Sequence, residues 1–182
     1  EVIVRLWTEE RVTHSGDFYA LDDVTMEPKP VQKPHPPIWW GGGQASIPRS
    51  AKWADYILAP CVTPREVADE YIPRMKAECE KWGTDTKMAS WTFATIDPDK
   101  SFSDDDVRDW ISDTMRFEDA DPDQIGATVA GSPQQCADKI AALHEAGVSD
   151  FVFTFQREGM DSISEARRQQ ELFAEKVLPL LG

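Results

Sequence analysis

The sequence has few basic residues and no long apolar run, and each absence excludes a class of function. Lysine and arginine number 19 against 33 aspartates and glutamates, so the formal net charge at pH 7 is −14. This acidic excess argues against nucleic-acid binding, which needs a basic surface. No window approaches the roughly 18 apolar residues of a membrane span, and residues 1–5 lack the order of a secretory signal. We therefore expect a cytoplasmic protein that binds neither nucleic acid nor membrane.

Cysteine and histidine are also scarce, and their spacing excludes the common frameworks built from them. The three cysteines are Cys61, Cys79 and Cys136, and the three histidines are His14, His35 and His144. An odd number of widely spaced cysteines fits neither a disulfide framework nor a CxxC metal or redox site, so we expect free thiols. Because no two histidines are three or four residues apart, the sequence predicts no metal site.

Apolar residues are plentiful enough to form a core. They make up 41% of the chain, and aromatic residues make up 10%, which is too much for a disordered acidic tail. A length of 182 residues first indicates one globular domain. The first residue is Glu1 rather than Met, so either processing has removed a segment or the chain is part of a longer one.

Short apolar runs alternate with helices whose first turns are well marked. The predicted strands cover residues 37–40, 56–59, 90–96 and 151–155. The predicted helices cover residues 45–54, 64–82, 103–117, 133–146 and 163–178. Capping boxes begin three of them, at Thr63, Ser132 and Ser162. Four strand–helix units predict a parallel α/β architecture, with one extra helix and an acidic loop between Ser101 and Gly131.

The first 37 residues follow another pattern. Residues 6–8 end an earlier helix, and residues 12–19 alternate around a Ser-Gly turn, as a hairpin does. Prolines at positions 28, 30, 34, 36 and 37 then impose an extended backbone. We therefore divide the chain into residues 1–37, with a helix end, a hairpin-like insertion and a Pro-rich connector, and residues 38–182.

A run of three glycines is the clearest chemical signal. Gly41, Gly42 and Gly43 lead from a predicted strand into a helix that begins near Ser46. Glycines permit close approach to the main chain, and a helix N-terminus offers unpaired N–H groups, so a phosphate could bind there. The order matches neither a Walker loop nor GxGxxG, and a tight strand-to-helix turn needs glycine with or without a ligand. Both interpretations stay open, and Ser46 and Arg49 are either phosphate ligands or a cap and a surface charge.

Other candidate groups are weaker. Four tryptophans, Trp39, Trp40, Trp53 and Trp91, could line a flavin-like pocket, although aromatic residues in and beside strands more often form core. The acidic run at residues 97–109 lacks the spacing of a calcium loop and indicates a solvated loop with an acidic helix N-terminus. Glu158, Asp161 and Glu165 follow the last strand, where barrel enzymes often keep catalytic groups, but a helix start explains them equally well.

Two stretches together resemble a known family. The first contains the LWTE motif at residues 6–9, the run EPKPVQKPHPPIW at residues 27–39 and the three glycines. The second runs from AGSPQ at residues 130–134 to ELFAEKVLP at residues 171–179. These residues are similar to the central stretch and the closing βα unit of the bacterial luciferase-like monooxygenases, and the likeness spans nearly the whole chain.

The resemblance implies a (β/α)8 TIM barrel, of which residues 38–182 would be the C-terminal half, about four βα units with strands five to eight. It also implies FMN or reduced flavin supplied by a flavin reductase, or the deazaflavin coenzyme F-420. The substrate would be a small organic molecule, and the protein a homo-oligomer. In the family the turn after the fifth strand contacts the cofactor phosphate. That turn corresponds to Gly41, Gly42, Gly43, Gln44 and Ser46.

Two differences from the family's pattern limit which residue roles can be assigned from the resemblance. Members commonly have Asp-Gly where this chain has Asp55-Tyr56, which puts the shape of the local pocket in doubt. The family's first four strands, which supply the groups usually assigned to chemistry, have no counterpart here, and a full barrel needs roughly 250 residues. We therefore name no catalytic residue. The alternative is a truncated, non-catalytic half-barrel that pairs with another chain through its open sheet edges.

Overall fold

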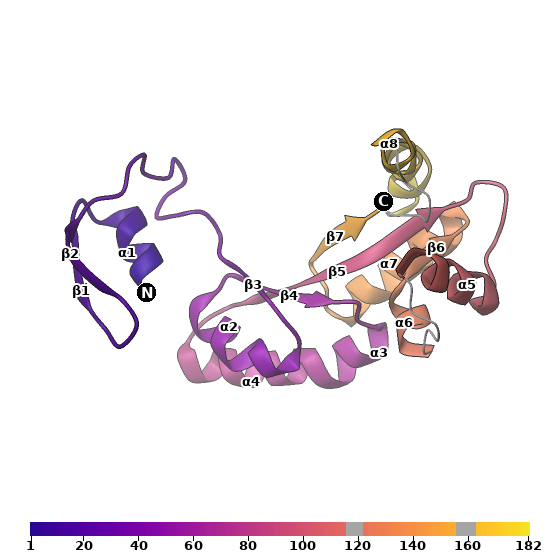
Figure 1. The fold of residues 1–182 in the computed structure, drawn as a ribbon. Coiled ribbons are helices and arrows are strands. Elements are labelled where there is room, and N and C mark those ends of the chain that lie inside the picture. The colour runs from indigo at the N-terminus through magenta and orange to yellow at the C-terminus, as the bar shows by residue number, and fades with distance from the viewer. Residues whose placement is uncertain (116–121, 156–162) are drawn as a thin grey trace. The chain divides into compact units, whose positions relative to one another are not determined.

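The computed structural model describes residues 1–115, 122–155 and 163–182, and it contains two compact units. The first unit is Glu1–Ile38 and the second is Trp39–Gly182. Both are drawn in Figure 1. Among the described residues, no helix has the length and apolar character needed to cross a membrane.

The first unit is a short helix followed by a hairpin. Helix α1 covers Val2–Thr8, and strands β1 (Val12–Ser15) and β2 (Ala20–Val24) pair in antiparallel register. The Gly16 N–H donates to Tyr19 O at 3.0 Å and closes the turn between the strands. Val12 is buried, although the unit contains few buried side chains. Polar contacts therefore contribute much of the stabilisation of this unit.

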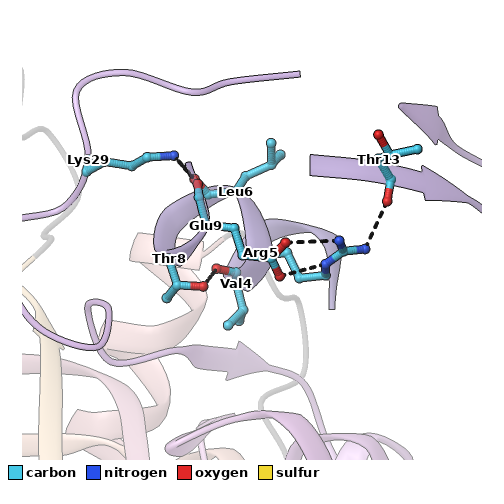
Figure 2. A network of polar contacts seen from close by, with 7 residues as sticks. All are labelled: Val4, Arg5, Leu6, Thr8, Glu9, Thr13 and Lys29. Carbon is cyan, nitrogen blue, oxygen red and sulfur yellow. Dashed lines mark hydrogen bonds and ion pairs between the residues drawn. The ribbon is translucent and has the colours of Figure 1, made fainter. Parts of the chain in front are cut away.

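Those polar contacts join α1 to the segments that follow it, as Figure 2 shows. The Arg5 guanidinium forms a two-bonded ion pair with Glu9, at 2.8 and 3.0 Å, and donates to Thr13 O at 3.2 Å. Lys29 Nζ donates to the carbonyl oxygens of Leu6 and Glu9, at 2.8 and 2.6 Å. Carbonyls at the C-terminus of a helix lack intrahelical partners, so the lysine ammonium satisfies groups that would otherwise need water.

The second unit is built on a parallel sheet. Its strands are β3 (Trp39–Gly41), β4 (Tyr56–Pro60), β5 (Lys87–Ile96), β6 (Val129–Gly131) and β7 (Asp150–Thr154). The pairs are β3 with β4, and β5 with each of β4, β6 and β7, all parallel. The predicted parallel α/β architecture is confirmed, and the four predicted strands correspond to β3, β4, β5 and β7.

Strand β6 is a correction to the sequence analysis, which placed only a loop and one helix between residues 101 and 131. Residues 94–96 of β5 pair with residues 129–131, beyond the part of β5 that pairs with β4. The Asp97 N–H also donates to Gly131 O at 2.9 Å. A strand of three residues is too short to show a period of two, which explains why the pattern missed it.

Helices follow the strands in the expected order, and several of them change between α-helical, 3-10 and π-helical geometry along their length. They are η1 (Gln44–Ser46), α2 (Ile47–Trp53), α3 (Pro64–Glu66), η2 (Val67–Tyr71), α4 (Ile72–Trp82), α5 (Asp104–Met115), α6 (Pro122–Ala127), α7 (Pro133–Ala146), α8 (Ile163–Leu172), η3 (Phe173–Val177) and η4 (Leu178–Leu180). The capping boxes predicted at Thr63 and Ser132 are both present. The end predicted at residue 117 lies outside the described residues.

The helix predicted at residues 64–82 is not a continuous α-helix. One α-helical turn (α3) leads into a π-helical turn (η2), and α4 begins with Pro73 in its first turn. Proline has no N–H to donate to the preceding turn, and its ring crowds the carbonyl four residues earlier in a regular α-helix, so the wider π-turn, closed by the Ile72 N–H on Val67 O, relieves that crowding. The departure from α-helical geometry thus lies in the turn just before Pro73.

Helices cover the two faces of the sheet to different extents. One face carries Ile57, Ala59 and Met88, which form a buried cluster with residues of α2, α4 and α7, and Figure 1 shows α2 and α4 along this side. The same face continues through Ala94 and Ile96 to a cluster with α7 and η3. On the opposite face α5 and α6 cover only the end near Phe93. Elsewhere this second face leaves Trp39 41% and Val152 37% exposed among the described residues.

A buried glutamine joins α8 to the end of β5. Gln169, which is 2% exposed, accepts the Ile96 N–H through Oε1 at 2.7 Å and donates from Nε2 to Ile96 O at 3.1 Å. The last β5 residue in register with β7 is Phe93. The side-chain amide of Gln169 therefore satisfies main-chain groups that lie beyond the partner strand.

We predict that Gln169→Leu lowers the free energy of unfolding by about 1–3 kcal/mol, because it leaves the buried N–H and C=O of Ile96 without partners. Gln170→Leu is the matched control, since Gln170 is the exposed neighbour and surface changes usually stay within about 0.5 kcal/mol. Urea unfolding followed by circular dichroism measures both. Equal midpoints for the two variants would show that the Gln169 amide contributes nothing specific.

Candidate functional site

The three glycines lie at the carboxyl end of β3, where the sheet meets the next helix. Gly41 pairs with Leu58 of β4, and the Gly42 N–H donates to Leu58 O at 3.1 Å before the chain turns into η1. The carboxyl ends of parallel strands share one edge of the sheet, and ligands of α/β proteins bind at that edge. The position of the turn therefore suits a binding site.

The backbone conformation at position 42 requires glycine. Its φ of 152° is a value that side chains rarely allow, and a Cβ there would lie 2.9 Å from Ser46 Oγ and 3.1 Å from Ser46 Cβ. The turn could not keep its shape with any other residue at this position. The structural interpretation of the glycine run is therefore correct for Gly42.

Gly41 and Gly43 have no such requirement. Gly41 lies within β3, and among the described residues no atom comes within 4 Å of the place its Cβ would occupy. Gly43 has an ordinary extended backbone with φ −78°, and its Cβ would make only a normal contact, 3.7 Å from the Tyr71 hydroxyl oxygen. Both residues are exposed. Their missing side chains leave the surface of the turn open to a ligand.

Ser46 closes the turn from within. Its N–H donates to Gly43 O at 2.9 Å, and its hydroxyl donates to the same oxygen at 2.7 Å. The hydroxyl proton is thus used inside the turn, and Ser46 fixes the orientation of the Gly43 peptide. Arg49, three residues further along α2, is exposed.

Gln44 and Gly43 lie beside two residues that the sequence analysis did not single out. The Gln44 side-chain Nε2 donates to a carboxylate oxygen of Glu70. The Tyr71 hydroxyl oxygen lies 3.7 Å from the position that a Cβ of Gly43 would occupy. Glu70 and Tyr71 end the π-turn η2. No local pattern in the sequence indicates that this π-turn lies beside the glycines.

The four candidate tryptophans do not line one pocket. Trp39 stacks on Tyr56 with ring centroids 4.4 Å apart, and the Trp91 indole N–H donates to Thr154 Oγ1 at 2.9 Å. The strand register places these two on the incompletely covered sheet face and Trp40 on the other. Trp53 lies on α2, 48% exposed and beside Lys52. The expectation that such residues form core is wrong for Trp39 and Trp53.

The acidic run is a helix N-terminus, as predicted. Asp106 accepts the Ser103 N–H and hydroxyl, both at 2.8 Å, and pairs with Lys100 Nζ at 2.6 Å. These donors lower the pKa of Asp106 to about 2. Of the acidic residues predicted after the last strand, Glu158 and Asp161 lie outside the described residues. Glu165 pairs with Arg168 at 2.9 Å on α8.

The three cysteines are free thiols in the structure. Cys136 is buried, and burial raises the pKa of its thiol to about 12. Cys61 is half-buried at the end of β4 and has a φ of 44°, which is strained for a residue with a side chain. In residues 1–115, 122–155 and 163–182, no group of three or more histidine, cysteine or acidic side chains could hold a metal ion.

Comparison with known proteins identifies the family. A model of the luciferase-like monooxygenase family matches residues 1–124, including the hairpin, the proline-rich segment and the glycine turn. The chain belongs to the luciferase-like monooxygenase family. The resemblance predicted from the motifs is confirmed.

Two curated relatives match nearly all of the chain at low identity. The FMNH2-dependent dimethylsulfone monooxygenase of Pseudomonas putida is 24% identical over 208 residues, with 97% of this chain and 54% of the relative covered. The F420-dependent glucose-6-phosphate dehydrogenase of Nakamurella multipartita is 26% identical over 204 residues, with 99% and 58% covered. The chain thus spans little more than half the length of either relative.

Solved structures show the fold. The coenzyme F420-dependent tetrahydromethanopterin reductase of Methanopyrus kandleri superposes with a TM-score of 0.73 at 18% identity, covering 100% of this chain and 61% of the reductase. An F420-dependent secondary alcohol dehydrogenase gives a TM-score of 0.70 at 19% identity, with 100% and 59% covered. The predicted fold class is therefore confirmed: the parallel sheet and its helices form part of an α/β barrel.

We predict that Gly42→Ala lowers the free energy of unfolding by about 1–3 kcal/mol, because alanine at this φ is strained and contacts Ser46. Gly41→Ala is the matched control and should leave stability unchanged or raise it by up to about 1 kcal/mol, since it only restricts the unfolded chain. Chemical denaturation monitored by tryptophan fluorescence measures both. If Gly41→Ala were the more damaging change, the assignment of the strained position would be wrong.

The buried thiol gives a prediction about pH. With a folded pKa of about 12 against an ordinary 8.5–9, Cys136 in the native chain should be about one thousandth thiolate at pH 9. Because the unfolded state releases this proton first, stability should fall as pH rises from about 9 towards 12. Iodoacetamide followed by peptide mass spectrometry should label Cys79 before Cys136 at pH 9. Early labelling of Cys136 would contradict its burial.

Proposed function

We propose that residues 38–182 form the C-terminal half of a (β/α)8 oxidoreductase that binds the phosphate of a flavin or deazaflavin cofactor at the glycine turn. The proposed site comprises Gly41, Gly42, Gly43, Gln44 and Ser46, in which the Gly42 N–H and the Ser46 hydroxyl are already bonded within the fold and shape the turn. Residues 1–37 are the insertion and connector that lead into this half. The substrate is a small organic molecule, and we assign no catalytic residue in this chain.

One observation carries the proposal: two of the three glycines have no conformational or steric need to be glycine. Side chains at Gly41 or Gly43 would occupy open space above an exposed turn at the carboxyl edge of the sheet. A site for a phosphate needs that space, because its oxygens must approach main-chain N–H groups within about 3 Å. The residues therefore fit the phosphate group of such a cofactor.

Because the chain is acidic, a phosphate must be bound by groups close to it rather than by the overall charge of the protein. A net charge of −14 repels a phosphate at a distance, so the phosphate must be held by oriented main-chain N–H groups. Arg49 lies one helical turn beyond Ser46 and brings a positive charge to the same end of α2.

The cofactor is FMN or reduced flavin, or alternatively coenzyme F-420. One of the two curated relatives is FMNH2-dependent and the other is F420-dependent, and their sequence identities to this chain are nearly the same. When bound, the cofactor supplies the redox chemistry, with molecular oxygen in the flavin case and by hydride transfer in the deazaflavin case. The flavin case includes a flavin reductase as partner. In both cases we propose a homo-oligomer.

The incompletely covered sheet face supports a second candidate function. Trp39 and Val152 expose apolar surface on one face of the parallel sheet. A truncated half-barrel would bury that face against another chain and act as a binding or structural partner. A monomer in sedimentation of the protein translated from its own start codon would contradict this second candidate, whereas binding of FMN or F-420 would support the first.

We predict that Gly41→Val weakens binding of the phosphate-bearing cofactor at least about ten-fold without lowering the melting temperature. Valine suits a strand, and the site of its Cβ is open, so the loss arises from blocked access to the turn. Titration of the complete protein with FMN and with F-420, followed by the ligands' fluorescence, measures the affinity. Unchanged affinity in Gly41→Val would contradict the proposed site.

The control uses the flavin without its phosphate. Riboflavin lacks the group that the glycine turn is proposed to bind, so Gly41→Val should change riboflavin affinity by less than about two-fold. A wild-type protein that binds neither FMN nor F-420 would contradict the proposed function as a whole.

A further inference from the structure

A cavity of about 360 Å³ lies among the helices around β6. Its walls come from α3, α5, α6, β6 and α7, which Figure 1 shows grouped near the end of β5. Among the described residues that line it, none belongs to the glycine turn at residues 41–46. A volume of this size is within the range of small-molecule sites. The cavity is therefore separate from the proposed cofactor site and large enough to hold a ligand of its own.

The apolar wall of the cavity is formed before any ligand binds. Val107 and Ile125 are each 8% exposed and belong to a buried cluster with Phe93, against which Phe102 packs. The side-chain amide of Gln135 fixes the main chain of Phe102: Oε1 accepts the Phe102 N–H at 2.9 Å, and Nε2 donates to Phe102 O at 2.8 Å. Because these residues are already ordered, an apolar ligand that contacts them loses little affinity to ordering of the wall.

One cationic side chain, Lys139 of α7, lines the same cavity. Its Nζ donates to Gly126 O at 2.7 Å, and this is its one hydrogen bond in the part of the chain that the structure describes. Burial lowers the pKa of the ammonium. An ammonium has three N–H donors, and a partly desolvated charge is stabilised by a hydrogen-bonded partner of opposite charge. A carboxylate within the cavity would be such a partner.

The two acidic side chains that line the cavity do not fill this role. Asp104 and Asp138 are both exposed, so water screens their charges. Asp138 accepts the side-chain N–H of Gln134 at 2.8 Å, whereas the Lys139 ammonium is bonded to a main-chain carbonyl. The ammonium therefore keeps donors for a ligand.

We propose that this cavity is a second binding site, which takes a small molecule with an apolar body and one carboxylate. The apolar body lies against Phe102, Val107 and Ile125, and the carboxylate accepts hydrogen bonds from Lys139 Nζ. This site does not depend on the proposed function, because it shares no residue with the glycine turn.

The test compares two probes that share one apolar ring system. Isothermal titration calorimetry of the complete protein at pH 7 uses 2-naphthoate, which carries a carboxylate, and 2-naphthol, which is neutral. The wild-type protein should bind 2-naphthoate with a dissociation constant of about 1 mM or below, and more tightly than 2-naphthol. Absence of 2-naphthoate binding, or equal affinity for the two probes, would overturn the proposal.

Lys139→Met tests the role of the ammonium. Methionine keeps an unbranched apolar side chain and removes the charge, so the affinity for 2-naphthoate should fall at least about ten-fold. The affinity for 2-naphthol should change by less than about two-fold. Equal losses for both probes would show that the substitution only loosens the cavity, and unchanged 2-naphthoate binding would show that Lys139 does not hold the carboxylate; either result would contradict the proposal.

Ala142→Leu tests the location of the site. Ala142 lines the cavity one helical turn beyond Lys139, and a leucine there occupies part of its volume. The affinity for both probes should fall at least about five-fold. Ala141→Leu is the matched control, because Ala141 is the exposed neighbour on the same helix, and it should leave both affinities within about two-fold of the wild type. Equal effects of the two variants would place the bound probe outside this cavity.

Discussion

The second unit depends on the shared main-chain hydrogen bonding of β5. This strand pairs with β4, β6 and β7, so most of the parallel sheet is organised around its ten residues. Buried N–H and C=O groups must all find partners. Where the partner strands end, side chains and loops provide them: the amide of Gln169 binds Ile96, and the Asp97 N–H reaches Gly131 O.

The same constraint shapes the candidate site. Parallel pairing brings the ends of β3 and β4 to one edge, so the turn after β3 lies beside the helix that follows β4. Gly42 makes the sharp turn possible, and Ser46 fixes the Gly43 peptide within it. That construction does not require glycine at positions 41 and 43. Backbone geometry thus accounts for Gly42, and we propose that function accounts for Gly41 and Gly43.

The sequence predicted features that depend on local chemistry. Capping boxes at Thr63 and Ser132 follow from side chains three residues apart, and the strands follow from apolar runs, so both could be found without tertiary structure. The three-residue strand β6 could not, because its pairing depends on a partner more than thirty residues away. The hydrogen bond from the Gln44 side chain to Glu70 joins two βα units and has no local signature. The distinction among the glycines likewise required backbone angles and neighbouring atoms.

A crystal structure of the complete protein with its bound cofactor tests the central claim most directly. The account predicts that a phosphate oxygen lies within about 3.2 Å of a main-chain nitrogen between residues 41 and 46. A cofactor whose phosphate lies away from this turn, with Gly41 and Gly43 still facing solvent, would contradict the account.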